Sequence, residues 1–323
     1  MKRIAILTSG GDAPGMNAAI RAAVRCGIAN GFEMFGVRNG YTGLIAGDFV
    51  ALGLRDVGGI INRGGTTLGT SRCPAFLNRE GQLKAIEQLR SSDIAALIVI
   101  GGNGSQAGAT EISRLGFPVV GVASTIDNDL AGTDISIGTT TALDTALDAI
   151  DRLRVTASSH HRAFLIEVMG RHSGFIALSV AVAGGAEVVI VPEVELHPET
   201  VATRLREAYK RGKSHAIAVV AEGAQLNAAQ LAQYFQEHRE RLGFELRLTT
   251  LGHVQRGGSP GVFDRTMATR FGAAAVDHLR NGSHGVLVGL SQGAVTATPY
   301  AQLSGAKKQF DRALYELAEV LAQ

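Results

Sequence analysis

The sequence predicts an α/β protein built from two doubly wound, mainly parallel sheets. Short apolar runs that end in Gly, Ser or Asp alternate with longer amphipathic stretches along the chain. Such alternation of strand and helix is typical of parallel sheets joined by right-handed crossovers. The run Ala96–Ile100 is apolar at successive positions, so helices are expected to cover both faces of its sheet.

Nine strands are expected in order along the chain, with helices between them. The strands are Arg3–Thr8, Glu33–Arg38, Ala95–Ile100, Val119–Ala123, Arg162–Val168, Glu187–Pro192, His215–Ala221, Glu245–Leu251 and Gly285–Leu290. The clearest helices are Met16–Asn30, Gly138–Ala157, Pro198–Gly212 and Asn227–Leu242. We place the domain break near Gly138, with returns near Arg256 and Gly305, which gives domains of 1–138 plus about 256–305 and about 139–255 plus 306–323.

The composition excludes several classes of protein. With 323 residues, 46% hydrophobic positions and a net charge of +2, the chain is long and apolar enough to fold as two domains. The balanced charge gives no electrostatic argument for nucleic acid or a membrane surface as the main partner. The two cysteines, Cys26 and Cys73, lack metal-ligand spacing, and no apolar run reaches the roughly 18 residues of a membrane span. We therefore expect a soluble, cytoplasmic protein.

Three segments at predicted strand ends have the composition of anion-binding or catalytic loops. Thr8–Asn17 contains Gly10, Gly11 and Gly15 before a helix, which favours phosphate binding over a plain tight turn. Gly101–Gly108 matches a loose dinucleotide fingerprint, but the next strand ends without the acidic residue that holds a ribose, so an NAD-linked dehydrogenase stays a weak alternative. Ser124–Asp129 places two carboxylates after a buried strand, which favours a general base or a magnesium ligand over a turn.

A fourth segment with candidate binding residues follows a predicted strand, and one further segment only resembles a known motif. The segment Leu251–Pro260 contains His253 and Arg256, which as hydrogen-bond donors would bind a phosphorylated ligand. The alternative is that His253 is a core histidine and Arg256 is a solvated arginine beside it. The sequence Gly212-Lys213-Ser214 resembles the end of a P-loop. It is not one, because the pattern requires glycine at position 207, where this chain has Glu, and a strand rather than a helix before the loop. We interpret the nearby basic residues as a solvated helix face; they are Arg204, Arg206, Lys210, Arg211 and Lys213.

Taken together, these segments resemble the bacterial 6-phosphofructokinases that use ATP. The segments that match are Thr8–Asn17, Asn62–Thr66, Gly101–Ser105, Thr125–Asp129, Glu167–Arg171, Ala221–Gly223 and Leu251–Pro260. The resemblance implies a nucleotide-binding domain and a sugar-phosphate-binding domain with the active site in the cleft between them, and a homotetramer. It implies transfer of the ATP γ-phosphate to the 1-hydroxyl of fructose 6-phosphate, with Mg²⁺ as cofactor, as an allosterically regulated step of glycolysis.

The resemblance also assigns roles to individual residues. Asp127 would be the base that accepts the sugar hydroxyl proton, since an ordinary Asp, with a pKa of about 3.9, is ionised at neutral pH. Thr125, Arg171 and Arg72 would assist catalysis, and Asn103 and Asp129 would hold the metal. The residues expected to bind ATP are Gly11, Tyr41, Arg72, Cys73, Phe76, Gly102, Asn103, Gly104 and Ser105.

Two further sets are implied for the sugar phosphate and for an effector. The sugar-phosphate set is Thr125, Asp127, Arg162, Met169, Gly170, Arg171, Glu222, Arg247, His253 and Arg256, with Arg162 and Arg247 reaching the 6-phosphate across a subunit interface. The set expected to bind the allosteric ligand, ADP or phosphoenolpyruvate, is Arg21, Arg25, Arg55, Arg154, Gly185, Glu187, Arg211 and Lys213.

The sequence departs from the family pattern at two places. Asn103 stands where the family has a metal-binding aspartate, which predicts weaker magnesium binding because Mg²⁺ favours carboxylate oxygen. Ala123-Ser124 replaces Pro-Gly, whereas Gly104 leaves room for the α-phosphate of ATP and so favours ATP over pyrophosphate as the donor. The alternative hypothesis is a weak or inactive paralogue, or an Asp-to-Asn variant, that binds nucleotide and sugar phosphate as a regulatory subunit or sensor.

Overall fold

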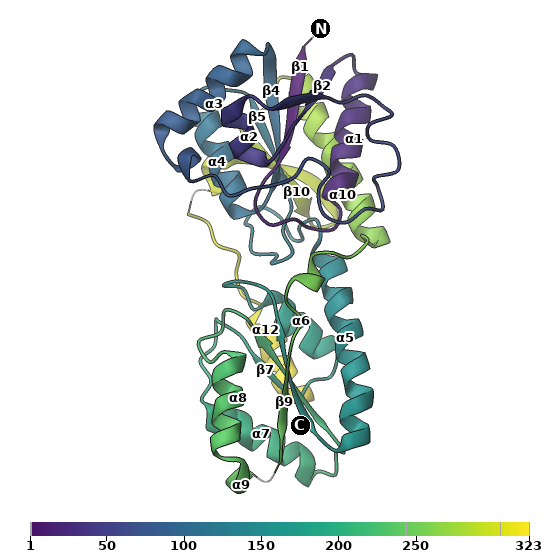
Figure 1. Ribbon diagram of the computed structural model, residues 1–323, viewed down its shortest axis with the longest axis vertical. Helices are drawn as coiled ribbons and strands as arrows, with labels where there is room; N and C mark the ends of the chain where they lie inside the picture. Colours follow the sequence, from purple (N-terminus) through teal and green to yellow (C-terminus); the bar gives the residue numbers. More distant parts are fainter. Residues whose placement is uncertain (1, 243, 304, 323) are drawn as a thin grey trace. The chain divides into compact units, whose positions relative to one another are not determined.

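The chain folds into two compact units, each containing segments that are distant in sequence. A computed structural model describes residues 2–242, 244–303 and 305–322. The first unit comprises Met1–Thr141 and Arg256–Lys308, and the second comprises Ala142–Gln255 and Gln309–Gln323. Each unit contains its own sheet, shown in Figure 1.

The first unit contains a seven-stranded sheet with the order β11-β10-β5-β4-β1-β2-β3. Its strands are β1 (Arg3–Thr8), β2 (Glu33–Val37), β3 (Phe49–Ala51), β4 (Ile94–Gly101), β5 (Val119–Ala123), β10 (Val286–Ser291) and β11 (Ala294–Pro299). Its helices are α1 (Met16–Ala29), α2 (Gly40–Ala46), α3 (Arg79–Ser91), α4 (Asn103–Arg114), α10 (Val262–Arg280) and α11 (Tyr300–Leu303), with a 3-10 turn η1 (Pro74–Leu77). The five inner strands are parallel, and β3 and β11 close the two edges as antiparallel strands.

Helices cover both faces of this sheet, as the apolar strands require. Figure 1 shows α1 and α10 on one side and α3 and α4 on the other. The α1 and α10 helices pack closely because Gly272 has no side chain: a Cβ there would lie 2.4 Å from the carbonyl oxygen of Ala19. Parallel strands all point the same way, so the loops after β1, β4 and β5 leave the same edge of the sheet.

The second unit contains a four-stranded, wholly parallel sheet with the order β7-β8-β6-β9. Its strands are β6 (Ala163–Val168), β7 (Val188–Ile190), β8 (Ala216–Ala221) and β9 (Leu246–Thr250). Its helices are α6 (Phe175–Ala183), α7 (Pro198–Lys210), α8 (Ala228–Glu237), α9 (Arg239–Leu242) and α12 (Arg312–Leu321), with a 3-10 turn η2 (Gly252–Gln255). Helix α5 (Thr139–His160) starts in the segment of the first unit and continues into the second.

Local sequence explains where the second unit's helices begin. Pro198 occupies the first turn of α7, where its missing N–H costs no hydrogen bond. Asn227 and Gln230 form a reciprocal capping box at the start of α8. Apolar side chains of α7 and α8, including Leu205 and Leu231, then pack against the buried strands β6, β7 and β8.

The predicted fold class and all nine predicted strands are confirmed, with end shifts of one or two residues. Two expectations were wrong. The helix expected over Asn227–Leu242 is interrupted at His238, which separates α8 from α9. The basic helix face is not fully solvated: the side chains of Arg204 and Arg206 are only 30% and 35% exposed, and Arg204 pairs with Glu319 at 2.6 Å. Among the described residues, none of the helices combines the length and apolar character that crossing a bilayer requires.

Candidate active site

The loop after β1 is shaped by glycine and by a buried arginine. Gly10 and Gly15 have φ angles of 83° and 115°, a left-handed region that disfavours other residues. A Cβ on Gly11 would lie 2.0 Å from Nη1 of Arg256, so a larger residue here would require the guanidinium to move. Arg256 Nη1 donates to the carbonyl of Asp12 at 3.1 Å. Two predicted segments, Thr8–Asn17 and Leu251–Pro260, therefore meet through Arg256.

The loop carrying Arg72 is tied to the same glycine loop. Thr70 Oγ1 donates to the Gly10 carbonyl at 2.8 Å, and Ser71 Oγ donates to the Asn39 carbonyl at 2.8 Å. Arg72 follows directly and its side chain is exposed, while Cys73 is half-buried. The anchors on both preceding residues hold this segment beside Gly10.

The segment after β4 passes directly into helix α4 and exposes the helix N-terminus. Gly102 caps the helix and Asn103 is its first residue. A Cβ on Gly104 would have no neighbour within 4 Å among the described residues, so space is open in front of this helix end. The unpaired N–H groups of the first turn and the positive end of the helix dipole favour an anion there. The buried Ser105 Oγ has no hydrogen-bond partner within the described part of the chain.

Two aromatic rings form a wall against α4. Tyr41 and Phe76 stack with ring centroids 3.9 Å apart and an interplanar angle of 19°. Tyr41 Oη donates to the Ser105 carbonyl at 2.6 Å, and burial raises the pKa of Tyr41 well above its usual value, so it remains a donor. The stack depends on Gly108, which the sequence analysis did not identify: a Cβ there would lie 2.8 Å from Tyr41 Oη.

The loop after β5 holds the predicted base in a buried position. Asp127 is 3% exposed, and its N–H donates to Thr125 Oγ1 at 3.2 Å. Asn128 adopts a left-handed φ of 49° and accepts at Oδ1 from the Ser136 N–H at 3.1 Å. The Thr125 carbonyl accepts hydrogen bonds from Ser136 Oγ at 2.7 Å and Thr139 Oγ1 at 3.0 Å. This loop is therefore rigidly held by its own polar side chains.

The β4 and β5 loops are in contact with each other. A Cβ on Gly102 would lie 3.2 Å from the Cβ of Thr125, and Asn103 Nδ2 donates to the Asp129 carbonyl at 3.4 Å. The two residues predicted to hold a metal are thus neighbours, with one carboxylate and one amide oxygen between them. No group of three His, Cys, Asp or Glu residues suited to a metal occurs among the described residues.

A second carboxylate, Asp264, organises this region and was missed by the sequence analysis. It is fully buried in the first turn of α10. Oδ1 accepts from the Gly138 N–H at 2.8 Å, and Oδ2 accepts from the Thr141 N–H at 2.8 Å and from the hydroxyls of Thr140 and Thr141, each at 2.6 Å. Asp264 thereby fixes the start of α5, three to five residues after the Ser136 that supports the candidate catalytic loop, Ser124–Asp129.

In the second unit, a loop after β6 is held by Glu222. Gly170 and Arg171 have φ angles of 145° and 52°. Glu222 Oε1 accepts from the N–H of Arg171 at 2.9 Å and from that of Gly170 at 3.3 Å. Met169 is buried beside them, and His253 lies exposed in η2 after β9. These five predicted residues all follow the carboxyl ends of parallel strands.

Arg162 and Arg247 lie at the other end of the same sheet. Arg162 precedes β6, and Arg247 pairs in register with Phe164 near the start of that strand. Both arginines form ion pairs with Glu245, at 3.8 and 2.9 Å. Arg162 precedes Met169 by seven positions, and the strand partner of Arg247 precedes it by five, which correspond to roughly 23 and 17 Å at about 3.3 Å per residue. Within a single chain, the second unit therefore does not bring all of its predicted sugar-phosphate residues together.

The predicted allosteric residues form two separate groups. In the first unit, Arg21 and Arg25 lie on α1, and Arg25 Nη2 donates to the Leu54 carbonyl, next to Arg55, at 3.4 Å. In the second unit, a Cβ on Gly185 would lie 3.8 Å from the guanidinium of Arg154.

The second of these groups centres on a buried acid, Glu187. Its carboxylate accepts from Lys213 Nζ at 2.8 Å and from the Ile217 N–H at 2.6 Å. Arg211 Nη2 instead donates to the Ala322 carbonyl at 2.8 Å. Burial lowers the pKa of the neighbouring His215, partly offset by the negative charge of Glu187.

Known proteins are similar in sequence to this protein along its whole length. A family model described as Phosphofructokinase matches residues 3–279. The ATP-dependent 6-phosphofructokinase 1 of Thermus thermophilus is 54% identical over 323 residues, and that of Clostridioides difficile is 50% identical over 322 residues; each alignment covers 100% of both chains. The solved phosphofructokinase structure from Saccharomyces cerevisiae superposes with a TM-score of 0.88 at 35% identity, covering 100% of this chain and 48% of that one. The chain therefore belongs to the phosphofructokinase family.

Proposed function

We propose that this protein transfers the γ-phosphoryl group of ATP to the 1-hydroxyl of fructose 6-phosphate, giving fructose 1,6-bisphosphate and ADP. The observation that carries the proposal is the position of Asp127, a buried carboxylate in the loop after β5, which leaves the same edge of the sheet as the glycine-rich loops after β1 and β4. A site that only bound phosphates would not require a carboxylate at this position, because its negative charge repels them. The full-length similarity to ATP-dependent enzymes supports the same reaction.

The residues of the first unit divide the chemistry among them. Asp127 accepts the proton of the attacking hydroxyl, which makes that oxygen a better nucleophile as the bond to phosphorus forms. Gly11 and the N-terminus of α4 give the phosphate chain backbone N–H donors, and the open space at Gly104 leaves room for it. The Tyr41–Phe76 pair provides an apolar wall for the nucleotide.

The donor set around Asn103 fits a magnesium ion that is shared with ATP. Mg²⁺ is usually held by one or two carboxylates together with substrate phosphates and water. Asp129 supplies the carboxylate and Asn103 supplies an amide oxygen. Bound magnesium would neutralise charge on the phosphates, and Arg72 and Arg171 would add positive charge to the transferred group.

The residues proposed to recognise the sugar phosphate lie at the two opposite ends of the sheet in the second unit. Met169, Gly170, Glu222 and His253 would contact the sugar, with Arg256 of the first unit. Arg162 and Arg247 would bind the 6-phosphate held by a second copy of the chain, because they lie roughly 20 Å along the sheet from Met169. This arrangement supports a homo-oligomer, a tetramer in the family pattern, with effector residues in the two groups described above. A cytoplasmic location is proposed because Cys26 and Cys73 are both free thiols, as in a reducing compartment.

The test measures fructose 1,6-bisphosphate formed from fructose 6-phosphate and Mg-ATP. The parent is expected to be active, and Asp127→Asn is expected to reduce kcat by about 10²- to 10⁴-fold, the usual contribution of a general base, with little change in the KM for ATP. Asp134→Asn serves as a control, since this carboxylate lies beyond the loop and accepts from the Gln292 N–H. A parent without activity that still binds both substrates would instead support the regulatory or sensor function.

A further inference from the structure

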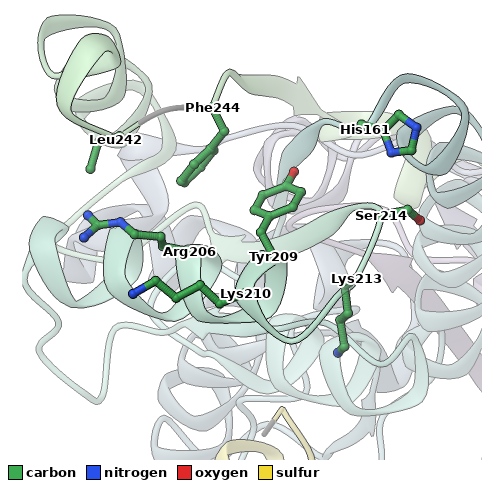
Figure 2. A pocket seen from close by; sticks show the side chains of 8 residues that line it. All are labelled: His161, Arg206, Tyr209, Lys210, Lys213, Ser214, Leu242 and Phe244. Atoms are coloured by element: carbon green, nitrogen blue, oxygen red, sulfur yellow. The ribbon is translucent and has the colours of Figure 1, made fainter.

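The second unit contains a pocket that includes none of the proposed catalytic residues. Its volume is about 450 Å³, within the range of small-molecule sites. Figure 2 shows Arg206 and Lys210 at one side of the pocket, Tyr209 and Phe244 in the middle, and His161 and Ser214 at the other side. Lys213 also lines it, but its ammonium is paired with Glu187, so Arg206 and Lys210 supply the main positive charge.

One face of helix α7 supplies most of the chemistry of the pocket. Arg206, Tyr209 and Lys210 are spaced three and four positions apart, which places them on the same helix face. His161 completes the far side from a left-handed backbone with a φ of 51°. The pocket is therefore positively charged and carries a ring nitrogen and a phenol as further polar groups.

Three hydrogen-bond donors of residues that line this pocket are buried and make no hydrogen bond within the described part of the chain. They are Arg206 Nε, Arg206 Nη2 and Tyr209 Oη. Most buried donors in folded proteins are paired, so unpaired ones need an explanation. A small rotation of the Arg206 and Tyr209 side chains would bring these donors to oxygen acceptors of a ligand, and phosphate or carboxylate oxygens would pair best with the arginine.

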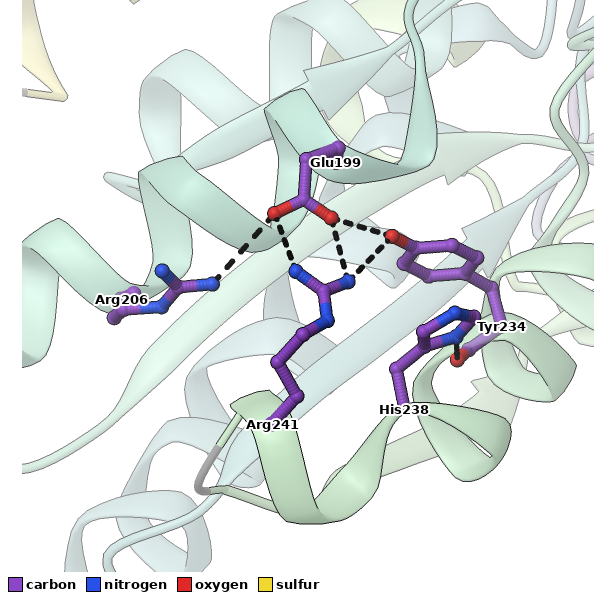
Figure 3. A network of polar contacts seen from close by, with 5 residues as sticks. All are labelled: Glu199, Arg206, Tyr234, His238 and Arg241. Carbon is purple, nitrogen blue, oxygen red and sulfur yellow. Dashed lines mark hydrogen bonds and ion pairs between the residues drawn. The ribbon is translucent and has the colours of Figure 1, made fainter.

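Arg206 lies at the edge of a polar network around Glu199, shown in Figure 3. Its Nη2 lies 3.8 Å from Oε1 of Glu199, too far for a hydrogen bond. Glu199 instead accepts two hydrogen bonds from Arg241, at 2.9 and 2.7 Å, and one from the hydroxyl of Tyr234. Because Arg241 already neutralises Glu199, the guanidinium of Arg206 remains available to a ligand.

The aromatic residues narrow the class of ligand. Tyr209 and Phe244 are tilted by 45° with ring centroids 5.4 Å apart, so they touch and leave no slot for a base between them. They offer an apolar side wall between two polar ends. A phosphorylated sugar fits this pattern, because it joins a dianionic group to a ring that carries hydroxyl groups.

We propose that this pocket is a second binding site for a sugar phosphate. The phosphate contacts Arg206 and Lys210, and the sugar hydroxyl groups contact Tyr209 Oη and the imidazole of His161. The proposal does not depend on the reaction assigned to Asp127, since the two sites share no residue.

The absence of tryptophan from the chain allows a direct test. Phe244→Trp places a single tryptophan in the pocket wall, and glucose 6-phosphate is titrated while its fluorescence is recorded. A saturable change is expected, weakened on the order of tenfold by Lys210→Gln because one charge-assisted contact is lost. Arg204→Gln is the matched control: it lies on the same helix but pairs with Glu319 and does not line the pocket.

The tryptophan of Phe244→Trp is larger than phenylalanine and could disturb Tyr209. Calorimetry therefore measures the binding of glucose 6-phosphate to the parent chain, which has no tryptophan, and to its Lys210→Gln variant. The same tenfold difference is expected there. The proposal is overturned if glucose 6-phosphate gives no saturable signal with folded protein, or if Lys210→Gln binds it unchanged. It is also overturned if inorganic phosphate or glucose alone binds as tightly as glucose 6-phosphate.

Discussion

At the scale of single residues, Asn103 is the side chain that we expect to set the metal requirement of the site. It opens helix α4 with an amide and contacts the Asp129 carbonyl, in a position where a second carboxylate would strengthen the attraction for Mg²⁺. Asn103→Asp is expected to lower the magnesium concentration for half-maximal activity on the order of tenfold, because affinity follows the number of charged ligands.

This prediction is measured by titrating Mg²⁺ at fixed ATP. Asp311→Asn, at the exposed start of α12, is the matched carboxylate control and should leave the midpoint unchanged. An unchanged midpoint in Asn103→Asp would mean that residue 103 does not contact the metal.

Asp264 supports the loop after β5 indirectly, because it fixes the start of α5 next to the residues that hold this loop. Asp264→Asn replaces one acceptor oxygen of the carboxylate with an amide NH₂ group. Buried N–H or hydroxyl groups that donated to that oxygen, such as those of Gly138 or Thr141, would then face another donor. Each buried group left unpaired costs about 1 to 3 kcal/mol, so the free energy of unfolding is expected to fall by about 2 to 4 kcal/mol.

Urea unfolding measures this loss. Asp311→Asn again serves as the comparison, because Asn caps a helix nearly as well as Asp and the variant should be almost neutral. Equal losses in the two variants would contradict the special role of Asp264. A fall in kcat that exceeds any change in KM would add that Asp264 positions the catalytic loop.

The residues that the sequence analysis missed share one property: their role depends on distant partners. Asp264 meets Thr140 across 124 positions, and Gly108 is required by the Tyr41–Phe76 stack rather than by its own neighbours. By contrast, Gly11 and Asp127 lie in local patterns that mark a strand end. Local spacing therefore identified the candidate site residues but not the residues that support them.

At the scale of elements, Glu199 joins three helices of the second unit. It belongs to the first turn of α7, while Tyr234 and Arg241 belong to α8 and α9. The hydrogen bonds from Arg241 and Tyr234 lower the pKa of Glu199 to about 2. Since the folded-state pKa lies below the ordinary value near 4.5, this link stabilises the fold above that value and is lost as the pH falls towards 2.

The comparison of Glu199→Gln with the parent tests this pH dependence. The difference in melting temperature is expected to be constant above about pH 5, and to shrink as the pH falls towards 2. Glu237→Gln, on α8 outside the network, controls for general loss of charge. A difference that stays the same across the whole range would show that the charge of Glu199 is not what links the helices.

The break between α8 and α9 shows why element boundaries were harder to predict than elements. Neither glycine nor proline occurs near His238, so the sequence carries no local stop signal. Strand β11 was missed because its run of small residues ends in proline and is only half-buried. The buried strands β1, β4 and β5 were predicted because their apolar character is continuous.

At the scale of the whole molecule, the separation of Arg247 from Met169 along the sheet of the second unit predicts that catalytic sites are shared between chains. Asp127→Asn and Arg247→Ala are each expected to be nearly inactive. When they are coexpressed in equal amounts, about a quarter of the sites combine a native Asp127 with a native Arg247 from another chain, so about a quarter of the activity should return. Recovery that does not exceed the two separate activities would place each site within one chain.

The discontinuous first unit also has a consequence for how the protein is made. Leu290 of β10 donates its N–H to Thr133 Oγ1, a contact between residues 157 positions apart. At translation rates of about 5 to 20 residues per second, the early strands wait roughly 8 to 30 seconds before β10 emerges beside β5. During that interval the nascent chain exposes an unpaired, wholly apolar strand edge, so the ribosome-bound protein is a natural client for chaperones.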